Sequence, residues 1–390
     1  MARTQPAGAE APPPVGTAAK PWDLARAPRI AVAKPRLVEL SAALPYLRSI
    51  DATRTYSNFG PLNSQFETRL AAQFGLEPGH VATCNNATSG LTMALQRAAA
   101  RGGRYCLMPA WTFAATAHAA LAAGLTPYLV DVDPRTWALT PEIALEALPR
   151  ISHGVAAIVP VAPFGLPLDA QAWDAFQAQT GVEVVLDAAA GFDALTVGRS
   201  VAVVSLHATK ILGIGEGGFV ISRDPDLIVD IRRRSNFGFD GSRDSSLIGC
   251  NGKISEFAAA YGLAALDHWK LQRAQYQSVL GYYRAALADL PDLRIAPGLG
   301  DDWMASTFNI EAPEAAILEI EARLGEAEIA TRRWWGKGLH GHQAFRDLPR
   351  APLPVTERLA ATTLGLPCWP GLDTTAIDEI SAVVRRVLTT

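Results

Sequence analysis

The stretch SLHATKILGIGEGG, Ser205–Gly218, decides what kind of fold this chain can adopt. It follows the apolar run Val201–Val204 and places Lys210 ahead of a glycine-rich turn. A lysine beside glycines is usually a solvated loop charge. A lysine held at the end of a buried strand can instead have a lowered pKa and react with a carbonyl group. Taken alone, the stretch leaves both interpretations open.

A second stretch, VVLDAAA at Val184–Ala190, places Asp187 at the end of another apolar run. A carboxylate carried into a buried position needs a partner. That partner can be a helix N-terminus or a cation, or it can be the ring nitrogen of a cofactor that serves as an electron sink. The order of strand, aspartate, strand, serine, lysine and glycine-rich turn is the layout of enzymes that use pyridoxal 5'-phosphate (PLP).

Short apolar runs alternate with helical stretches through the first two-thirds of the chain. Several runs are continuous in Val, Ile and Leu, which is typical of strands covered by helices on both faces. The alternation predicts an α/β fold with an open, mostly parallel sheet, in which ligands bind beyond the carboxyl ends of the strands. The predicted strands are His80–Cys84, Arg104–Met108, Pro127–Asp131, Ala156–Val161, Val182–Leu186, Ser200–Ser205 and Gly218–Ser222.

Capping residues and helical stretches predict where helices begin and where the domains divide. Thr88 and Ser89 are predicted to cap a helix over Thr88–Ala100, and Thr140-Pro141-Glu142 is typical of another helix start. A long helix is predicted over Glu256–Leu287. Beyond it the chain changes character, with helices expected at Glu314–Leu324 and Thr375–Leu388. We therefore expect a flexible tail over residues 1–35, a large cofactor-binding domain over 36–265 and a small domain over 266–390.

Composition excludes several classes of protein. The chain has 390 residues, of which 49% are hydrophobic and 19% charged, so it can bury a substantial core. A formal net charge of -3 does not favour a nucleic-acid partner. The cysteines are scattered without a CxxC pair, which favours a reducing cytoplasm. The uncharged stretch Tyr105–Val130 is interrupted by prolines, so we expect strand, helix and strand there rather than a membrane span.

Two further stretches have side chains suited to a phosphorylated cofactor. Cys84–Leu91 (CNNATSGL) runs from a strand into a helix N-terminus, where free N–H groups and hydroxyls can bind phosphate. An ordinary helix cap is the commoner use of Thr and Ser. Pro109–Phe113 places aromatic residues at a strand end, where a ring can stack on a cofactor or simply pack in the core.

Taken in order, these stretches resemble the DegT/DnrJ-type (StrS-like) sugar aminotransferases, a family of fold-type I PLP enzymes. The resemblance extends from about Leu37 to the C-terminus. It implies a large α/β domain, with a mostly parallel central sheet flanked by helices, and a smaller C-terminal α+β domain. The matching segments are Tyr56–Leu62, Asn86–Leu95, Trp111–Thr116, Ser205–Gly218, Gly249–Glu256 and Leu364–Pro367.

The resemblance also implies roles for individual residues. Lys210 would hold PLP and act as the catalytic acid and base, and Asp187 would face the pyridine nitrogen. Phe113 would stack on the ring. Three residues would bind the cofactor's phosphate group: Ala87 through its backbone, Thr88 and Ser205. Asn251 would contact the phosphate of the other subunit's cofactor, which implies a homodimer with its sites at the subunit interface.

The implied reaction moves an amino group from L-glutamate to a nucleotide-linked keto-deoxysugar, in amino-sugar and polysaccharide biosynthesis. One alternative is another enzyme of the same type, such as a cyclitol aminotransferase or an aminohydroxybenzoate synthase. A second alternative is a catalytically silent paralogue that binds or regulates. Lys210 favours an active aminotransferase, because the related sugar dehydratases have histidine at that position.

The chain departs from the family pattern at three places. Ala190 stands where glutamine is usual near the cofactor's ring oxygen, and Ala87 stands where glycine is usual in the phosphate turn. The segment Val161–Gly165 lacks the histidine often found early in it. A hydrogen bond to the ring oxygen is therefore missing or comes from another group.

Other polar residues give weaker signals. His340 lies where the family often has a histidine near the sugar nucleotide, but a structural role is equally compatible with the sequence. His340 and His342 have no obvious third metal ligand, so we predict no metal site. The run Arg232-Arg233-Arg234 could attract a nucleotide diphosphate, although such runs usually form a solvated face.

Overall fold

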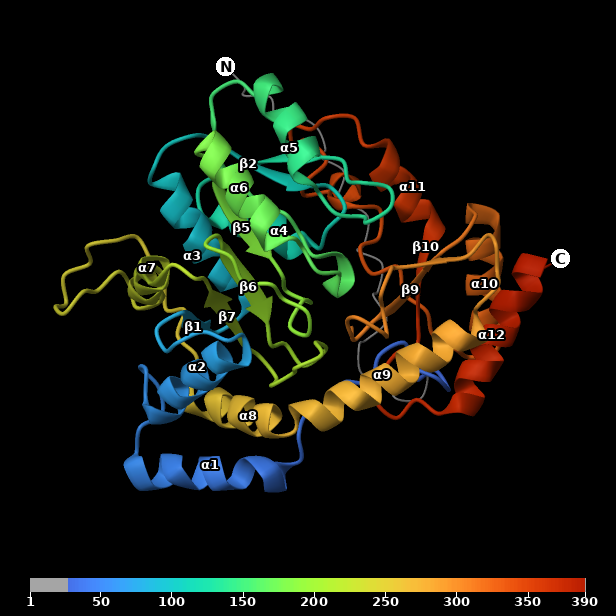
Figure 1. Cartoon of the computed structure of the whole chain (residues 1–390), viewed down its shortest axis with the longest axis horizontal. Coiled ribbons are helices and arrows are strands. Elements are labelled where there is room, and N and C mark those ends of the chain that lie inside the picture. Colours follow the sequence, from blue (N-terminus) through green and yellow to red (C-terminus); the bar gives the residue numbers. More distant parts are fainter. Residues whose placement is uncertain (1–26, 390) are drawn as a thin grey trace, which may run out of the picture.

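The computed structural model describes residues 27–389 and has a seven-stranded sheet at the centre of its larger part (Figure 1). Of the tail predicted over residues 1–35, residues 1–26 lie outside the described residues, whereas Ile30 and Val32 are buried. The strand order is β1-β7-β6-β5-β4-β2-β3. All neighbours pair in parallel except β7, which is antiparallel to both β1 and β6. The strands are β1 Val81–Cys84, β2 Tyr105–Pro109, β3 Thr126–Val130, β4 Val155–Ile158, β5 Glu183–Asp187, β6 Val201–Ser205 and β7 Gly218–Ile221.

Each strand overlaps a strand predicted from the continuous apolar runs, and the predicted α/β class is confirmed. The runs are continuous because both faces of the sheet are covered. In β5, Val184 and Leu186 lie in one core cluster, whereas Val185 lies in the other. The helices after the strands are α3 Ala87–Ala99, α4 Ala114–Ala122, α5 Pro141–Ala147, α6 Ala170–Thr180 and α7 Pro225–Ser235, with 3₁₀ turns at Leu148–Arg150 and Pro163–Gly165.

The uncharged stretch Tyr105–Val130 forms β2, α4 and β3, as predicted. Alanines from α4, including Ala117, Ala119 and Ala120, pack against the sheet in its second core cluster. Within residues 27–389, no helix combines the length and apolar character that crossing a membrane requires.

The predicted N-cap of α3 is wrong by two residues. Asn86, in an extended conformation, caps the helix by accepting a hydrogen bond from the Ser89 N–H at 2.8 Å. Asparagine competes well with Thr and Ser at this position because its short side chain reaches the same N–H groups. Because Asn86 caps the helix, the Thr88 hydroxyl is not used in the cap.

The long helix predicted over Glu256–Leu287 is also wrong. The segment forms two helices, α8 Glu256–Asp267 and α9 Trp269–Ala286, separated by His268 with φ −100° and ψ 2°. Helix α8 packs on α1 Leu40–Thr53 and α2 Pro61–Gln73, whereas α9 runs on toward the second sheet (Figure 1). Because of the break at His268, α8 packs in the larger part of the molecule and α9 packs on α12 Thr374–Thr389 in the C-terminal part.

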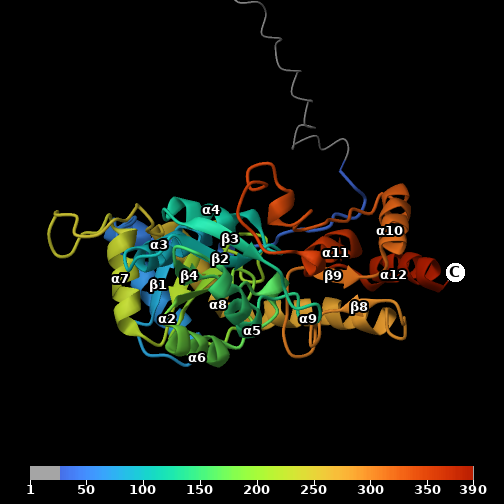
Figure 2. The same cartoon turned by 90° about the horizontal axis from the view of Figure 1, so that it is seen from above.

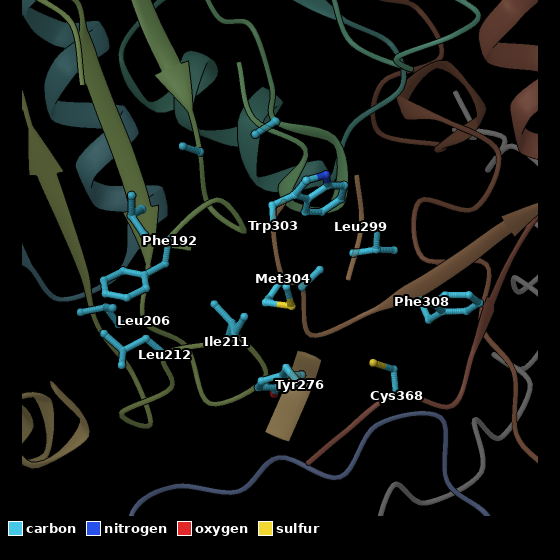
Figure 3. Packing of buried hydrophobic residues seen from close by; sticks show 14 of the residues in the cluster. Phe192, Leu206, Ile211, Leu212, Tyr276, Leu299, Trp303, Met304, Phe308 and Cys368 are labelled. Atoms are coloured by element: carbon cyan, nitrogen blue, oxygen red, sulfur yellow. The ribbon is translucent and has the colours of Figure 1, made fainter. Parts of the chain in front are cut away.

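A three-stranded antiparallel sheet in the order β10-β9-β8 organises the C-terminal part. The first described residues contact this C-terminal part: Ile30 pairs with Ile329, and the Cys368 N–H donates to the Val32 carbonyl. One core cluster continues from Phe192 and Leu206 to Phe308 and Cys368, as Figure 3 shows. The elements are β8 Arg294–Ile295, β9 Phe308–Glu311, α10 Glu314–Glu326, a 3₁₀ turn Leu339–Gly341, α11 Pro354–Thr362, β10 Thr363–Leu366 and α12 Thr374–Thr389.

Candidate active site

The reversed direction of β7 brings distant segments together at the carboxyl edge of the sheet. Gly218, the first residue of β7, pairs with Cys84 at the end of β1 and with Ser205 at the end of β6. A Cβ atom on Gly218 would lie 2.8 Å from the Ala87 nitrogen. Only glycine allows so close an approach. The predicted phosphate-binding residues Ala87 and Ser205 therefore lie around one glycine.

This corner of the sheet has the donors that an anion needs. Ala87 and Thr88 are the first residues of α3, where backbone N–H groups have no acceptor within the helix. The Ser205 hydroxyl accepts from the His207 N–H at 3.2 Å, so its own proton is available to donate. Ala87, Thr88 and Ser205 thus lie at one corner of the sheet, and we call these three residues the predicted phosphate cradle.

Asp187 ends β5 at the same edge and is 5% exposed. Its carboxylate accepts the Thr116 hydroxyl at 2.8 Å and the Ala189 N–H at 3.1 Å. Burial raises the pKa of the Asp187 carboxyl group, and the Thr116 and Ala189 hydrogen bonds and the positive charge of Lys210 oppose that rise. Asp187 is therefore a buried acid whose charged form is held by a few specific contacts.

Lys210 lies in a turn that the core anchors from its C-terminal side. Ile211 and Leu212 pack beside Phe192 and Tyr276 in the cluster of Figure 3. The Gln272 side chain donates to the Ile211 carbonyl at 2.8 Å. Burial lowers the pKa of the Lys210 amine, and the Asp187 carboxylate partly restores it. The partly buried amine is thus closer to its reactive neutral form than a solvated lysine is.

The glycine-rich turn closes back on the lysine segment. The N–H of Ala208 donates to the Gly215 carbonyl at 2.8 Å, and the N–H of Leu206 donates to the Gly217 carbonyl at 2.9 Å. Gly215 has φ +103°, a conformation that side chains disfavour. The glycines therefore give Lys210 a fixed backbone, as the family resemblance implies.

The aromatic segment after β2 divides into a buried and an exposed part. Trp111 is 2% exposed and packs edge-on against Phe164 and Trp335. Phe113, which precedes α4, is 60% exposed, and no ring contact involves it among residues 27–389. Trp111 is a core residue, and Phe113 presents a free ring face.

Asn251 lies next to the phosphate cradle but is exposed. Its carbonyl accepts from the Asn85 side chain at 3.4 Å, and it pairs with Asn236 in an isolated bridge. Residues 237–250 between these asparagines form the loop that extends from the body in Figures 1 and 2. We call residues 236–252 the projecting segment. Whether Asn251 reaches a partner's cofactor stays a prediction, because the structure contains a single chain.

Two residues with evident roles at the site were quoted in the sequence motif but given no function. Thr112 and Thr116 form a hydrogen bond between their hydroxyls at 2.9 Å, and Thr116 continues it to Asp187. Thr112 precedes the N-cap Phe113, and Thr116 lies in the first turn of α4, so the bend before the helix brings the two hydroxyls together. Their contact with Asp187, however, spans 71 positions of sequence.

The arginine run does not offer free charges. Arg232 pairs with Glu67, Arg233 with Asp240 and Arg234 with Asp230. His340 is partly buried, and its Nδ1 has no hydrogen-bond partner within the described part of the chain. Over the same residues, no three His, Cys, Asp or Glu side chains form a cluster that could hold a metal ion.

Comparison with known proteins identifies relatives over almost the whole described chain. Residues 40–385 match the DegT/DnrJ/EryC1/StrS aminotransferase family. Protein Rv3402c of Mycobacterium tuberculosis is 34% identical over 85% of this chain and 83% of its own length. The dTDP-4-amino-4,6-dideoxy-D-glucose transaminase of Shigella dysenteriae is 29% identical over 92% of this chain and 99% of its own length. The crystal structure of DesI with its TDP-sugar product superposes with a TM-score of 0.82, at 32% identity and 93% coverage of both chains.

Proposed function

Because the chain belongs to the DegT/DnrJ/EryC1/StrS aminotransferase family, we propose that it moves an amino group from L-glutamate to a nucleotide-linked keto-deoxysugar, with PLP as its cofactor. The family, the fold class and aminotransferase activity predicted from the sequence are confirmed. The observation that supports the proposal most strongly is the placement of Lys210 and Asp187. They lie at one sheet edge, each changing the pKa of the other, beside a phosphate cradle.

Residues of this chain are proposed for the ring nitrogen, the ring face, the aldehyde and the phosphate group of PLP. When bound, PLP supplies a ring that accepts electrons from the carbon bearing the amino group. The Asp187 carboxylate would hold a proton on the pyridine nitrogen, and Phe113 would cover one face of the ring. The phosphate would take the N–H groups of Ala87 and Thr88 and the hydroxyl of Ser205.

Lys210 has two tasks in this proposal. Its amine, with a pKa lowered by burial, is the nucleophile that would attach the cofactor. Once displaced by a substrate amine, the same Nζ atom would accept a proton from the substrate carbon and return it on the cofactor side. The core contacts of Ile211 and Leu212 would keep this atom in place through both half-reactions.

The substrate class follows from the relatives' names. The Shigella relative is a dTDP-sugar transaminase, and DesI was solved with a TDP-sugar product. We therefore propose a nucleotide-linked sugar as the amino acceptor and amino-sugar biosynthesis, in the cytoplasm, as the context.

The proposed assembly is a homodimer with its sites at the subunit interface. The projecting segment exposes apolar side chains: Phe237 is 45% exposed and Ile248 is 78% exposed. With Phe239 and Leu247 they line an open groove. A second copy seated there would bury these side chains and bring Asn251 toward the partner's cofactor.

The test is the visible spectrum of the purified protein with PLP, before and after L-glutamate. We expect a visible band that glutamate bleaches and that an added nucleotide-linked keto-sugar restores. A colourless protein would contradict the proposal and favour a silent paralogue. Recovery of the band by a keto-cyclitol, or by a ketone precursor of aminohydroxybenzoate, but by no nucleotide sugar, would instead favour those alternatives.

A further inference from the structure

A chain of buried hydroxyls ends on the carboxylate of Asp187. Thr112 and Thr116 are each 1% exposed, and their Oγ1 atoms are 2.9 Å apart. The Thr116 Oγ1 lies 2.8 Å from the Asp187 Oδ2. Both threonines come from the turn that begins α4, on either side of the predicted ring-stacking residue Phe113. One short segment therefore reaches two parts of the proposed cofactor site.

The direction of the protons in this chain is fixed by counting donors. A threonine hydroxyl has one proton to give. When Asp187 is ionised it can only accept, so Thr116 must donate to it. Thr116 then has no proton left for Thr112, and Thr112 must donate to Thr116. The hydrogen bonds align in one direction, toward the carboxylate, and each strengthens the next.

Few other groups form a hydrogen bond or an electrostatic contact with the Asp187 carboxylate. The remaining hydrogen bond to its side chain in the described chain is the Ala189 N–H, which bonds to the other oxygen, Oδ1. The charged group that acts on its pKa is Lys210. Val161, which pairs with Asp187 in an isolated bridge beyond β4, and Ala190, which follows β5, have no polar side chain to offer it. Thr116 is the side-chain contact that orients this acid.

We propose that Thr116 is a positioning residue, which holds the Asp187 carboxylate ionised and directed toward the pyridine nitrogen, with Thr112 orienting the Thr116 hydroxyl. The inference rests on the proposed function, because it takes PLP as the cofactor. It adds that the contact between Asp187 and the pyridine nitrogen depends on the Thr116 hydroxyl in α4. Loss of that hydroxyl leaves Asp187 Oδ2 without its donor in a buried place.

The experiment compares two ligands and two substitutions. Thr116→Val keeps the shape of the side chain and removes the hydroxyl, whereas Thr116→Ser keeps the hydroxyl and removes a methyl group. The ligands are PLP and its 1-deaza analogue, which has a carbon in place of the ring nitrogen. Dissociation constants of both are measured for each variant, with circular dichroism and thermal melting to confirm folding.

We expect Thr116→Val to weaken PLP binding about tenfold, the loss typical of a hydrogen bond to a charged group. It should leave binding of the 1-deaza analogue within about twofold of wild type, because that ligand has no nitrogen for Asp187. Thr116→Ser should bind PLP within about threefold of wild type.

Equal weakening of both ligands, or no effect of Thr116→Val on PLP, would overturn the inference. If Thr116→Val fails to fold, Thr116→Ser and Thr112→Val take its place, since Thr112→Val should weaken PLP alone and by a smaller factor. Wild-type protein that binds neither ligand would instead overturn the proposed function itself.

Discussion

The carboxyl-edge site, formed by Ala87, Thr116, Asp187, Ser205 and Lys210, and the projecting segment at residues 236–252 are organised in opposite ways. At the site, the carboxylate is buried and each of its oxygens accepts a hydrogen bond from this chain. In the projecting segment, by contrast, Ile248 is 78% exposed and lines an open groove. The difference agrees with the proposed assembly, in which Lys210 and Asp187 come from one chain and a second copy covers the exposed side chains of the projecting segment.

The largest effect should come from the centre of the carboxyl-edge site. Lys210→Ala should lower the transamination rate by about a thousandfold or more, because the Lys210 amine is the proposed acid and base at that carbon. The measurement is the rate at which glutamate bleaches added PLP. Lys270→Ala, an exposed lysine at the start of α9, is the matched control and should retain wild-type rates. Comparable rates in both variants would contradict the assignment of Lys210.

The next effect tests the projecting segment. Ile248→Asp would place a charge where the proposed interface is apolar, and burial of an unpaired charge is costly. We expect self-association at least about tenfold weaker, measured by analytical ultracentrifugation, with activity falling on dilution. Leu318→Asp is the control, since Leu318 is also exposed, at 54%, but lies on α10. A wild-type protein that sediments as a monomer would contradict the dimer.

The interaction between the charges of Asp187 and Lys210 predicts a smaller effect, a pKa change whose direction is fixed. The Asp187 carboxylate raises the pKa of Lys210, so removing its charge should lower that pKa further. The reaction measured is the attachment of pyridoxal to the cofactor-free protein. Asp187→Asn should move the midpoint of its pH–rate profile to lower pH. The profile is followed by absorbance, with Asp193→Asn as control. A midpoint that moved to higher pH would contradict the coupling.

The smallest effect concerns a position where this chain departs from its family. Ala190→Gln should restore a hydrogen bond near the cofactor's ring oxygen and tighten PLP binding about fivefold, the usual net gain from one such bond. Ala190→Leu adds comparable bulk without an amide and should give no gain. Weaker binding by Ala190→Gln than by Ala190→Leu would show that the ring oxygen already has a partner here.

The sheet and the site elements could be predicted because their signals are local. Continuous apolar runs such as Val201–Val204 indicate strands covered on both faces. Lys210 and Asp187 stood out because charged residues end such runs. The break at His268 and the cap at Asn86 were missed, since the sequence stretch around each also suits the predicted alternative and packing decides between them. The Thr116–Asp187 contact joins segments brought together only by strand order.

Attachment of PLP to Lys210 is the claim on which the rest depends, and the chain has few lysines with which Lys210 could be confused: Lys20, Lys34, Lys253, Lys270 and Lys337. The direct measurement is to incubate the protein with PLP, reduce it with borohydride, digest it and identify the modified peptide by mass spectrometry. We predict one stoichiometric adduct, on Lys210, that is lost when glutamate is added before reduction. An adduct mainly on another lysine, or none at all, would contradict the account.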